Sequence, residues 1–223
     1  MEYILSAITM FQKGGVVMYI LLLCSIFVIA IGIERGLFFY HADSGRAFAR
    51  LFAMRVYNKE FQVARDLAGS TKGALADIIT DGLNRYSTNP EKLNSYLEVH
   101  SGIALAGLRK RLYYLSVIVT MAPLLGLLGT ISGMISSFSV FNLESGQATA
   151  ITGGVGEALI ATAMGLCVAI IALIVHSYYT QRIDAVVTDM EQCFSLIEDN
   201  RADFAETSMD DIQPVSQKAG AAA

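Results

Sequence analysis

The chain has 223 residues, of which 54% are hydrophobic and 16% are charged, and its formal net charge is −4. Because a soluble domain carries about a quarter charged residues, this composition favours a membrane protein over a large soluble one. No basic stripe with interleaved aromatic residues occurs, which argues against nucleic-acid binding. The cysteines at 24, 167 and 193 are far apart in sequence, so neither a disulfide framework nor a metal site is expected.

The first apolar stretch predicts a transmembrane helix over residues 16–37. Its uncharged run, VVMYILLLCSIFVIAIGI, is about long enough to cross ~30 Å of hydrocarbon. A cleaved signal peptide is disfavoured because a basic leader and a small-residue cleavage site are missing. Glu34 and Arg35 end the run as an adjacent charge pair. Residues 1–15 fit two interpretations, a short helix lying at the membrane interface or a frayed terminus.

Residues 38–111 differ in composition, because charges of both signs alternate with apolar residues at helical spacing. Breaks between helices are expected at Gly69–Gly73 and near residue 90. At the second break, Thr88 or Asn89 would cap a helix with Pro90 in its first turn. The segment therefore predicts a cytoplasmic helical hairpin or small bundle. The GSTKG sequence within it lacks the spacing of a phosphate-binding loop, so nucleotide binding is not expected.

Two further apolar stretches predict the second and third transmembrane helices, over residues 112–141 and 153–178. A short polar connection, residues 142–152, joins them and contains no lysine or arginine. Helical periodicity continues through residues 179–205, which predicts a cytoplasmic helix. Residues 206–223 have little to bury and are expected to form a disordered tail.

The distribution of basic residues predicts the orientation of these helices. Twelve of the sixteen lysine and arginine residues lie between residues 35 and 111. By the positive-inside rule, this loop and the C-terminus are cytoplasmic, and the N-terminus and the connection at 142–152 are outside. The predicted fold class is an all-α membrane protein with three transmembrane helices, N-out and C-in, and long cytoplasmic helical extensions.

Small residues recur along the second and third predicted spans. Gly126, Gly129 and Gly133 share the second span, and Gly165 lies in the third among regularly spaced alanines. In a membrane, where lipid is as apolar as leucine, small residues allow helix backbones to approach closely. These glycines are predicted to pack helices together, either within one subunit or between subunits.

Three polar side chains in these spans are candidates for an ion path. Thr130 fits either a bond to a carbonyl of its own helix or, with Thr162 at similar depth, a pore lining. Glu157 fits either the outer start of the third span, where the helix dipole favours an acid, or a deeper site. A charge at the centre of a membrane costs about 2.5–3.5 kcal/mol, so a deep Glu157 would be neutral, paired or facing water.

Three motifs in these stretches resemble the TolQ/ExbB/MotA family of ion-driven inner-membrane motors, closest to ExbB and TolQ. They are the IER that ends the first span, APLLGLLGTISGM in the second, and GEALIATAMGL in the third. The resemblance covers nearly the whole chain and implies a pore-forming homo-oligomer, a homopentamer, in the bacterial inner membrane. By motif position, it places the family's pore threonines at Thr130 and Thr162 and its pore glutamate at Glu157.

The resemblance also implies partners and a function. The expected partners are copies of the chain, membrane lipids, an ExbD/TolR-like single-span subunit whose aspartate carries protons, and a TonB/TolA-like periplasm-spanning protein. The chain would be a proton-channel subunit that powers outer-membrane transport or envelope integrity. It is expected to be no enzyme and to need no cofactor. The alternatives are a sodium-driven stator-type unit and a non-conducting membrane scaffold.

This sequence departs from the family's pattern at its prolines. Gly153 and Ile171 stand where the family often has proline in the third span, and the proline after the glycine pair at the start of the first span is missing. None of these changes removes a polar residue of the expected ion path. They affect only the local kinks of the helices.

Overall fold

A computed structural model of the chain describes residues 15–42, 45–86, 89–143 and 148–210, and this part of the chain is helical without any strand. The helices are α2 (Gly15–Ala42), α3 (Gly45–Tyr57), α4 (Phe61–Ser70), α5 (Ala74–Tyr86), α6 (Pro90–Arg109), α7 (Leu112–Leu143), α8 (Ala148–Asp199) and α9 (Arg201–Asp210). The expected interfacial segment up to residue 14 and the tail from residue 211 lie outside the described residues.

The chain divides into two compact units. The first, here called the spanning unit, comprises Met1–Arg35 and Arg111–Thr180; the second, the bundle unit, comprises Gly36–Lys110 and Gln181–Ala223. Three described helices, α2, α7 and α8, contain stretches long and apolar enough to cross a membrane. The prediction of an all-helical chain with three apolar helices of spanning length is therefore confirmed.

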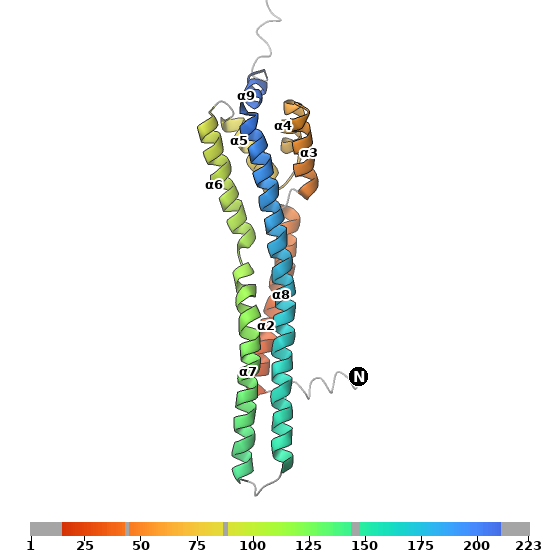
Figure 1. The fold of residues 1–223 in the computed structure, drawn as a ribbon, viewed down its shortest axis with the longest axis vertical. Helices are drawn as coiled ribbons and strands as arrows, with labels where there is room; N and C mark the ends of the chain where they lie inside the picture. The colour runs from red at the N-terminus through yellow and green to blue at the C-terminus, as the bar shows by residue number, and fades with distance from the viewer. Residues whose placement is uncertain (1–14, 43–44, 87–88, 144–147, 211–223) are drawn as a thin grey trace, which may run out of the picture. The chain divides into compact units, whose positions relative to one another are not determined.

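In the spanning unit, α7 and the first part of α8 run side by side and antiparallel, as the green and teal helices of Figure 1. Helix α7 continues to Leu143 and α8 begins at Ala148, so both ends of the expected connection at 142–152 are helical, and its residues 144–147 lie outside the described residues. Many large apolar side chains of this unit are exposed, such as Leu23, Leu124 and Ile174. In a membrane-spanning protein, such side chains face lipid or another helix rather than water.

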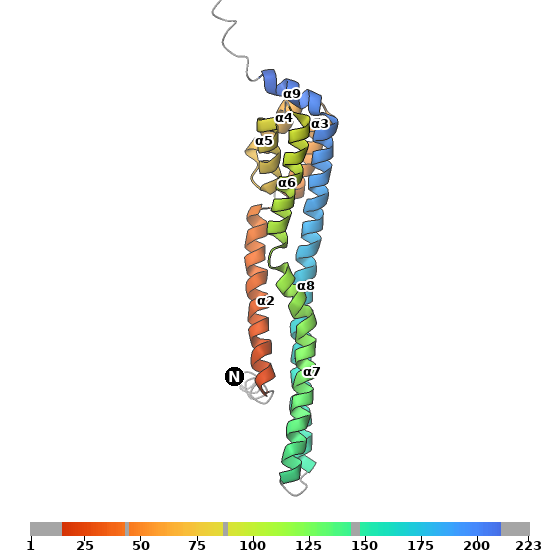
Figure 2. The ribbon, with the colours of Figure 1, turned by 90° about the vertical axis from the view of Figure 1, so that its left-hand side faces the viewer.

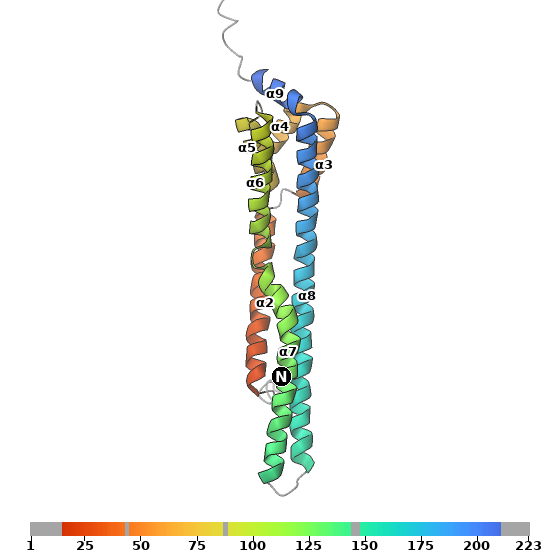
Figure 3. The same cartoon turned by 60° about the vertical axis from the view of Figure 1, so that its left-hand side comes forward.

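The bundle unit contains the shorter helices of the chain, which pack together partly through aromatic rings. Helices α3, α4, α5 and α6 contact one another in chain order, and α9 lies against α4 (Figure 2). Phe204 of α9 is buried, with its ring 6.4 Å from that of Phe52 and 5.1 Å from that of Phe61. A view between those of Figures 1 and 2 shows α9 at the end of α8, after a break at Asn200 (Figure 3).

Local sequence signals set the helix ends in this unit. Helix α4 ends at Ser70 and α5 begins at Ala74, after Gly73 with φ of 129°, a conformation that glycine tolerates. The Asn89 side chain accepts a hydrogen bond from the Lys92 N–H at 3.2 Å, with Pro90 opening α6. Both predicted breaks and the Asn89 cap are thus confirmed. Thr88, the alternative cap, lies outside the described residues.

Candidate ion-path site

The backbones of α7 and α8 touch where the two helices each carry a glycine. A Cβ added at Gly126 would lie 3.0 Å from the Cα of Thr162, and one at Gly165 would lie 2.5 Å from the carbonyl oxygen of Ala122. Such distances leave no space for a methyl group unless the helices move apart. Helix packing at this depth therefore depends on the absence of side chains.

The same contact continues toward the C-terminal end of α7 and the N-terminal end of α8. A Cβ at Gly129 would lie 2.7 Å from the Ala161 Cβ, and one at Gly133 would lie 2.9 Å from the Ala158 Cβ. We call this contact between α7 and α8 the glycine seam; it comprises Gly126, Gly129, Gly133, Ala158, Ala161, Thr162 and Gly165. The four glycines named from the sequence all lie in it, and their contacts are within one chain.

Thr162 bridges the glycine seam with a hydrogen bond. Its Oγ1 donates to the carbonyl oxygen of Gly126 at 2.9 Å, from α8 to α7. A side chain at Gly126 would push Thr162 away, so this hydrogen bond depends on the glycine at position 126. Hydrogen bonds of this kind between membrane helices contribute about 0.6 kcal/mol on average and at most about 1.7.

Thr130 bonds within its own helix. Its Oγ1 donates to the carbonyl oxygen of Leu127 at 2.7 Å, the local alternative noted from the sequence. Since Thr130 follows Gly126 by one helical turn, it lies on the same side of α7 as the residue that Thr162 contacts. Both threonines are half-buried, so each keeps part of its surface outside the pair of helices.

Glu157 belongs to the described backbone of α8, but its side chain is outside the described residues. Because α8 begins at Ala148, Glu157 lies beyond the first turn of the helix. The dipole of a helix acts on charges within its first turn. A simple helix-dipole role for Glu157 therefore loses support, while its neighbour Ala158 lies directly in the glycine seam.

The chemistry available at the seam is that of hydroxyl oxygens. A hydroxyl group has one donor and two acceptor lone pairs, and the donors of Thr130 and Thr162 are committed to carbonyls. What each oxygen can still offer is a lone pair, which accepts a hydrogen bond from water or ligates a cation. Among the described residues, no group of three histidine, cysteine, aspartate or glutamate side chains is placed to hold a metal ion.

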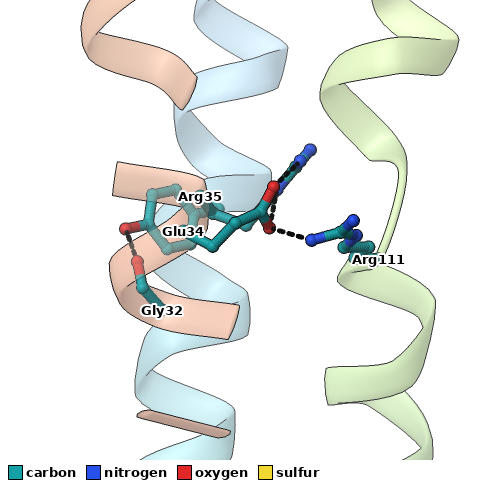
Figure 4. Close-up of polar contacts among 5 residues, drawn as sticks. Gly32, Glu34, Arg35 and Arg111 are labelled. Carbon is teal, nitrogen blue, oxygen red and sulfur yellow. Dashed lines mark hydrogen bonds and ion pairs between the residues drawn. The ribbon is translucent and has the colours of Figure 1, made fainter. Parts of the chain in front are cut away.

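A second polar cluster of the spanning unit was not anticipated from the sequence (Figure 4). Glu34 accepts two hydrogen bonds from the buried Arg35, at 2.9 and 2.6 Å, and forms an ion pair with Arg111 at 3.1 Å. The Tyr179 hydroxyl donates to the carbonyl oxygen of Gly32 at 2.6 Å. We call these five residues the polar cluster; it connects α2 with α8 and with the residue that directly precedes α7.

The sequence contained a signal for this cluster. Glu34 and Arg111 are the charged residues that directly flank two different apolar spans, and opposite charges at adjacent span ends can pair. The adjacent Glu34–Arg35 pair was interpreted only as the end of a span. Neighbouring residues on a helix do not normally face each other, so a two-point contact between them indicates that the buried Arg35 requires a counter-charge.

These observations define a multi-pass membrane protein with a glycine-packed helix pair that carries two hydroxyl side chains. The sequence profile of the MotA/TolQ/ExbB proton channel family matches residues 70–192, more than half of the chain. The chain belongs to this family, whose ExbB and TolQ members are channel and transport subunits.

Individual relatives agree with this assignment. Biopolymer transport protein ExbB-like 1 of Synechocystis sp. is 34% identical over 193 residues, covering 81% of this chain and 76% of that protein. Biopolymer transport protein ExbB of Neisseria gonorrhoeae is 36% identical over 112 residues, 44% of this chain and 50% of that protein. The Tol-Pal system protein TolQ of Haemophilus influenzae is 33% identical over 87 residues, 38% of each chain.

Proposed function

We propose that the chain is the proton-channel subunit of an inner-membrane motor complex of the ExbB/TolQ kind. It uses the proton-motive force to drive a periplasm-spanning partner for outer-membrane transport or envelope integrity. The observation that carries the proposal is the glycine seam, which joins two apolar helices closely. It places Thr162 of α8 against Gly126 of α7, one helical turn before Thr130. Family membership supports the same function.

The proposed assembly follows the family. The partners are a single-span subunit of the ExbD/TolR kind and a TonB/TolA-like protein, and the chain itself forms a homopentamer with its N-terminus outside. The basic residues between 35 and 111 support this orientation, because they place that loop on the cytoplasmic side. The exposed apolar side chains of α7 and α8 supply the surfaces that copies, partner helix and lipid would cover.

We assign different roles to the three polar residues. Thr130 and Thr162 line the ion path, where their oxygen lone pairs stabilise a hydrated proton on its way to an aspartate of the single-span partner. Glu157 tunes proton entry or the contacts between subunits. A proton crossing ~100 mV releases about 2.3 kcal/mol, so the groups along the path must bind the ion weakly enough for it to leave.

The function is tested by reconstituting the chain in liposomes with a single-span subunit of the ExbD/TolR kind from the same organism. We expect proton uptake, measured with an internal pH dye under an imposed membrane potential, only when both proteins are present. Liposomes that contain the chain alone serve as the control. Equal, negligible uptake with and without the partner, in complexes shown to be assembled, would support the non-conducting scaffold instead.

Whether the complex conducts protons or Na⁺ needs a separate measurement, because hydroxyl oxygens also ligate Na⁺. The same liposomes are measured with and without Na⁺ at fixed potential. Proton uptake that is unchanged when K⁺ replaces Na⁺ supports the proton-driven unit. Uptake of Na⁺ in place of protons would identify the sodium-driven alternative.

A further inference from the structure

Arg111 carries positive charge that the polar cluster does not balance. The cluster contains two guanidinium groups and one carboxylate, and the two-point contact of Glu34 is with Arg35. Among the described residues, Arg111 makes a single ion pair, and its side chain is 48% exposed. Since a guanidinium has five N–H donors in a planar fork, this one ion pair leaves donors of the half-exposed side chain for a further ligand.

The backbone presents Arg111 in an unusual conformation. Its φ is 72°, in the left-handed region that costs about 1–2 kcal/mol for a residue with a side chain. It stands between the end of α6 at Arg109 and the start of α7 at Leu112. Strain of this kind persists where the surrounding structure requires it, and here it directs a guanidinium toward α2 at the end of an apolar helix.

An exposed aromatic pair joins the same two helices on their apolar side. The rings of Phe27 and Tyr114 meet edge to face at 6.2 Å, and the side chains are 47% and 53% exposed. Phe27 precedes Glu34 by about two helical turns on one face of α2, and Tyr114 follows Arg111 by about one turn on α7. The ion pair and the aromatic pair thus bridge α2 and α7 at successive levels.

We propose that this face of α2 and α7 binds an anionic phospholipid. The lipid phosphate contacts the free donors of Arg111, and the glycerol and acyl chains lie against Phe27 and Tyr114. Charge favours a lipid with net negative charge over a zwitterionic one, because the polar cluster carries one excess positive charge. The exposed face of α2 continues with Leu23 and Ile20, which extends the apolar surface along an acyl chain.

The proposal is tested with the purified full chain in neutral detergent. Phosphatidylglycerol and phosphatidylcholine with identical acyl chains are titrated, and bound lipid is counted by native mass spectrometry. The wild type is expected to bind phosphatidylglycerol more tightly. Loss of a hydrogen bond to a charged group makes Arg111→Gln bind phosphatidylglycerol about tenfold more weakly or worse. Phosphatidylcholine, whose phosphate charge is offset by its choline, should lose less, so the preference disappears in Arg111→Gln and is retained in Arg111→Lys.

Two further variants separate the parts of the site. Tyr114→Ala should weaken both lipids equally, because it removes only apolar contact. Arg85→Gln is the matched control, since Arg85 also forms an exposed ion pair, with Asp81 at 3.8 Å, and should change neither lipid.

Three kinds of result would overturn the proposal. One is equal affinity of the wild type for the two lipids, or a preference that survives Arg111→Gln. The second is displacement of the lipid by millimolar inorganic phosphate, which would show a free-anion site. The third is an Arg111→Gln variant that binds lipid normally but forms smaller complexes, which would assign this face to a second copy of the chain.

Discussion

Thr130 and Thr162 have the same side chain and both donate to carbonyls of α7, but only Thr162 does so from the neighbouring helix. Thr162 donates across the seam to Gly126, whereas Thr130 donates to its own helix. The position of both within the motif could be recognised from sequence. The contact of Thr162 with the Gly126 carbonyl could not, because it depends on the register of α7 against α8.

Cys193 offers a prediction at the scale of one residue. It lies in the bundle unit, beyond the expected span of residues 153–178, and is fully buried. Burial, reinforced by the negative charge of Asp189, raises the pKa of this thiol to about 12. In the folded protein, Cys193 is therefore expected to stay protonated and to resist maleimide labelling at pH 8, as detected by mass spectrometry of peptides.

The same shift has a consequence for stability. Because the folded state keeps the thiol neutral, the Cys193 thiol contributes to the free energy of unfolding. This contribution is fully present below the thiol pKa of the unfolded chain, about 8.5. It is lost as pH rises from there toward 12.

The denatured protein serves as the control for labelling, since its Cys193 must react. Rapid labelling of folded protein at pH 8 would contradict the burial.

Gly165 tests the seam at the scale of helix packing. Gly165→Ala places a methyl group against the Ala122 carbonyl and the Gly126 backbone, which forces α7 and α8 apart. We expect a loss of about 1–3 kcal/mol, typical of overpacking, measured as a lower unfolding midpoint in detergent. The contact is with backbone, which cannot rotate away as a side chain can.

Gly156→Ala is the matched control for this substitution. Gly156 lies on the same helix, and a Cβ there meets nothing within 4 Å in the described structure. Both substitutions gain the helix propensity of alanine, up to about 1 kcal/mol, so their difference isolates the steric contact. If the two variants unfolded at the same midpoint, the described seam would be incorrect.

Phe204 tests the attachment of α9 within the bundle unit. Phe204→Ala removes a ring that packs against Phe52 and Phe61, and large-to-small substitutions of this kind cost about 3–5 kcal/mol. Hydrogen exchange should increase throughout α9. Tyr57→Ala, at an exposed aromatic of the same unit, should leave α9 protected; equal exchange in both variants would contradict the packing.

The elements themselves were largely predictable. Uncharged runs located the spanning helices, and the Asn89–Pro90 pair marked the start of α6, because these signals are local in sequence. The single helix α8, which continues from the third span to Asp199, was anticipated as two adjoining segments. The polar cluster was not predicted, since Glu34 and Arg111 meet only after two spans have packed.

The chain combines a spanning unit and a bundle unit, and the family profile matches residues of both. Hydropathy and charge distribution predicted the membrane class from the sequence. The pairing of α7 with α8 could be expected from their small residues, but whether those residues face the same chain or a neighbour could not. The contacts at Gly126, Gly129, Gly133 and Gly165 assign the seam to one chain.

The most direct test of the proposed function is proton uptake by Thr162 variants, measured per assembled complex in liposomes with the single-span partner. Thr162→Ser keeps the hydroxyl and should retain uptake within about twofold, whereas Thr162→Val keeps the shape and should reduce it at least about tenfold, the effect of about 1.4 kcal/mol on a barrier. Thr120→Val, on α7 with a hydroxyl bonded to its own helix, is the control. Wild-type uptake in assembled Thr162→Val complexes would contradict a role for this hydroxyl in the ion path.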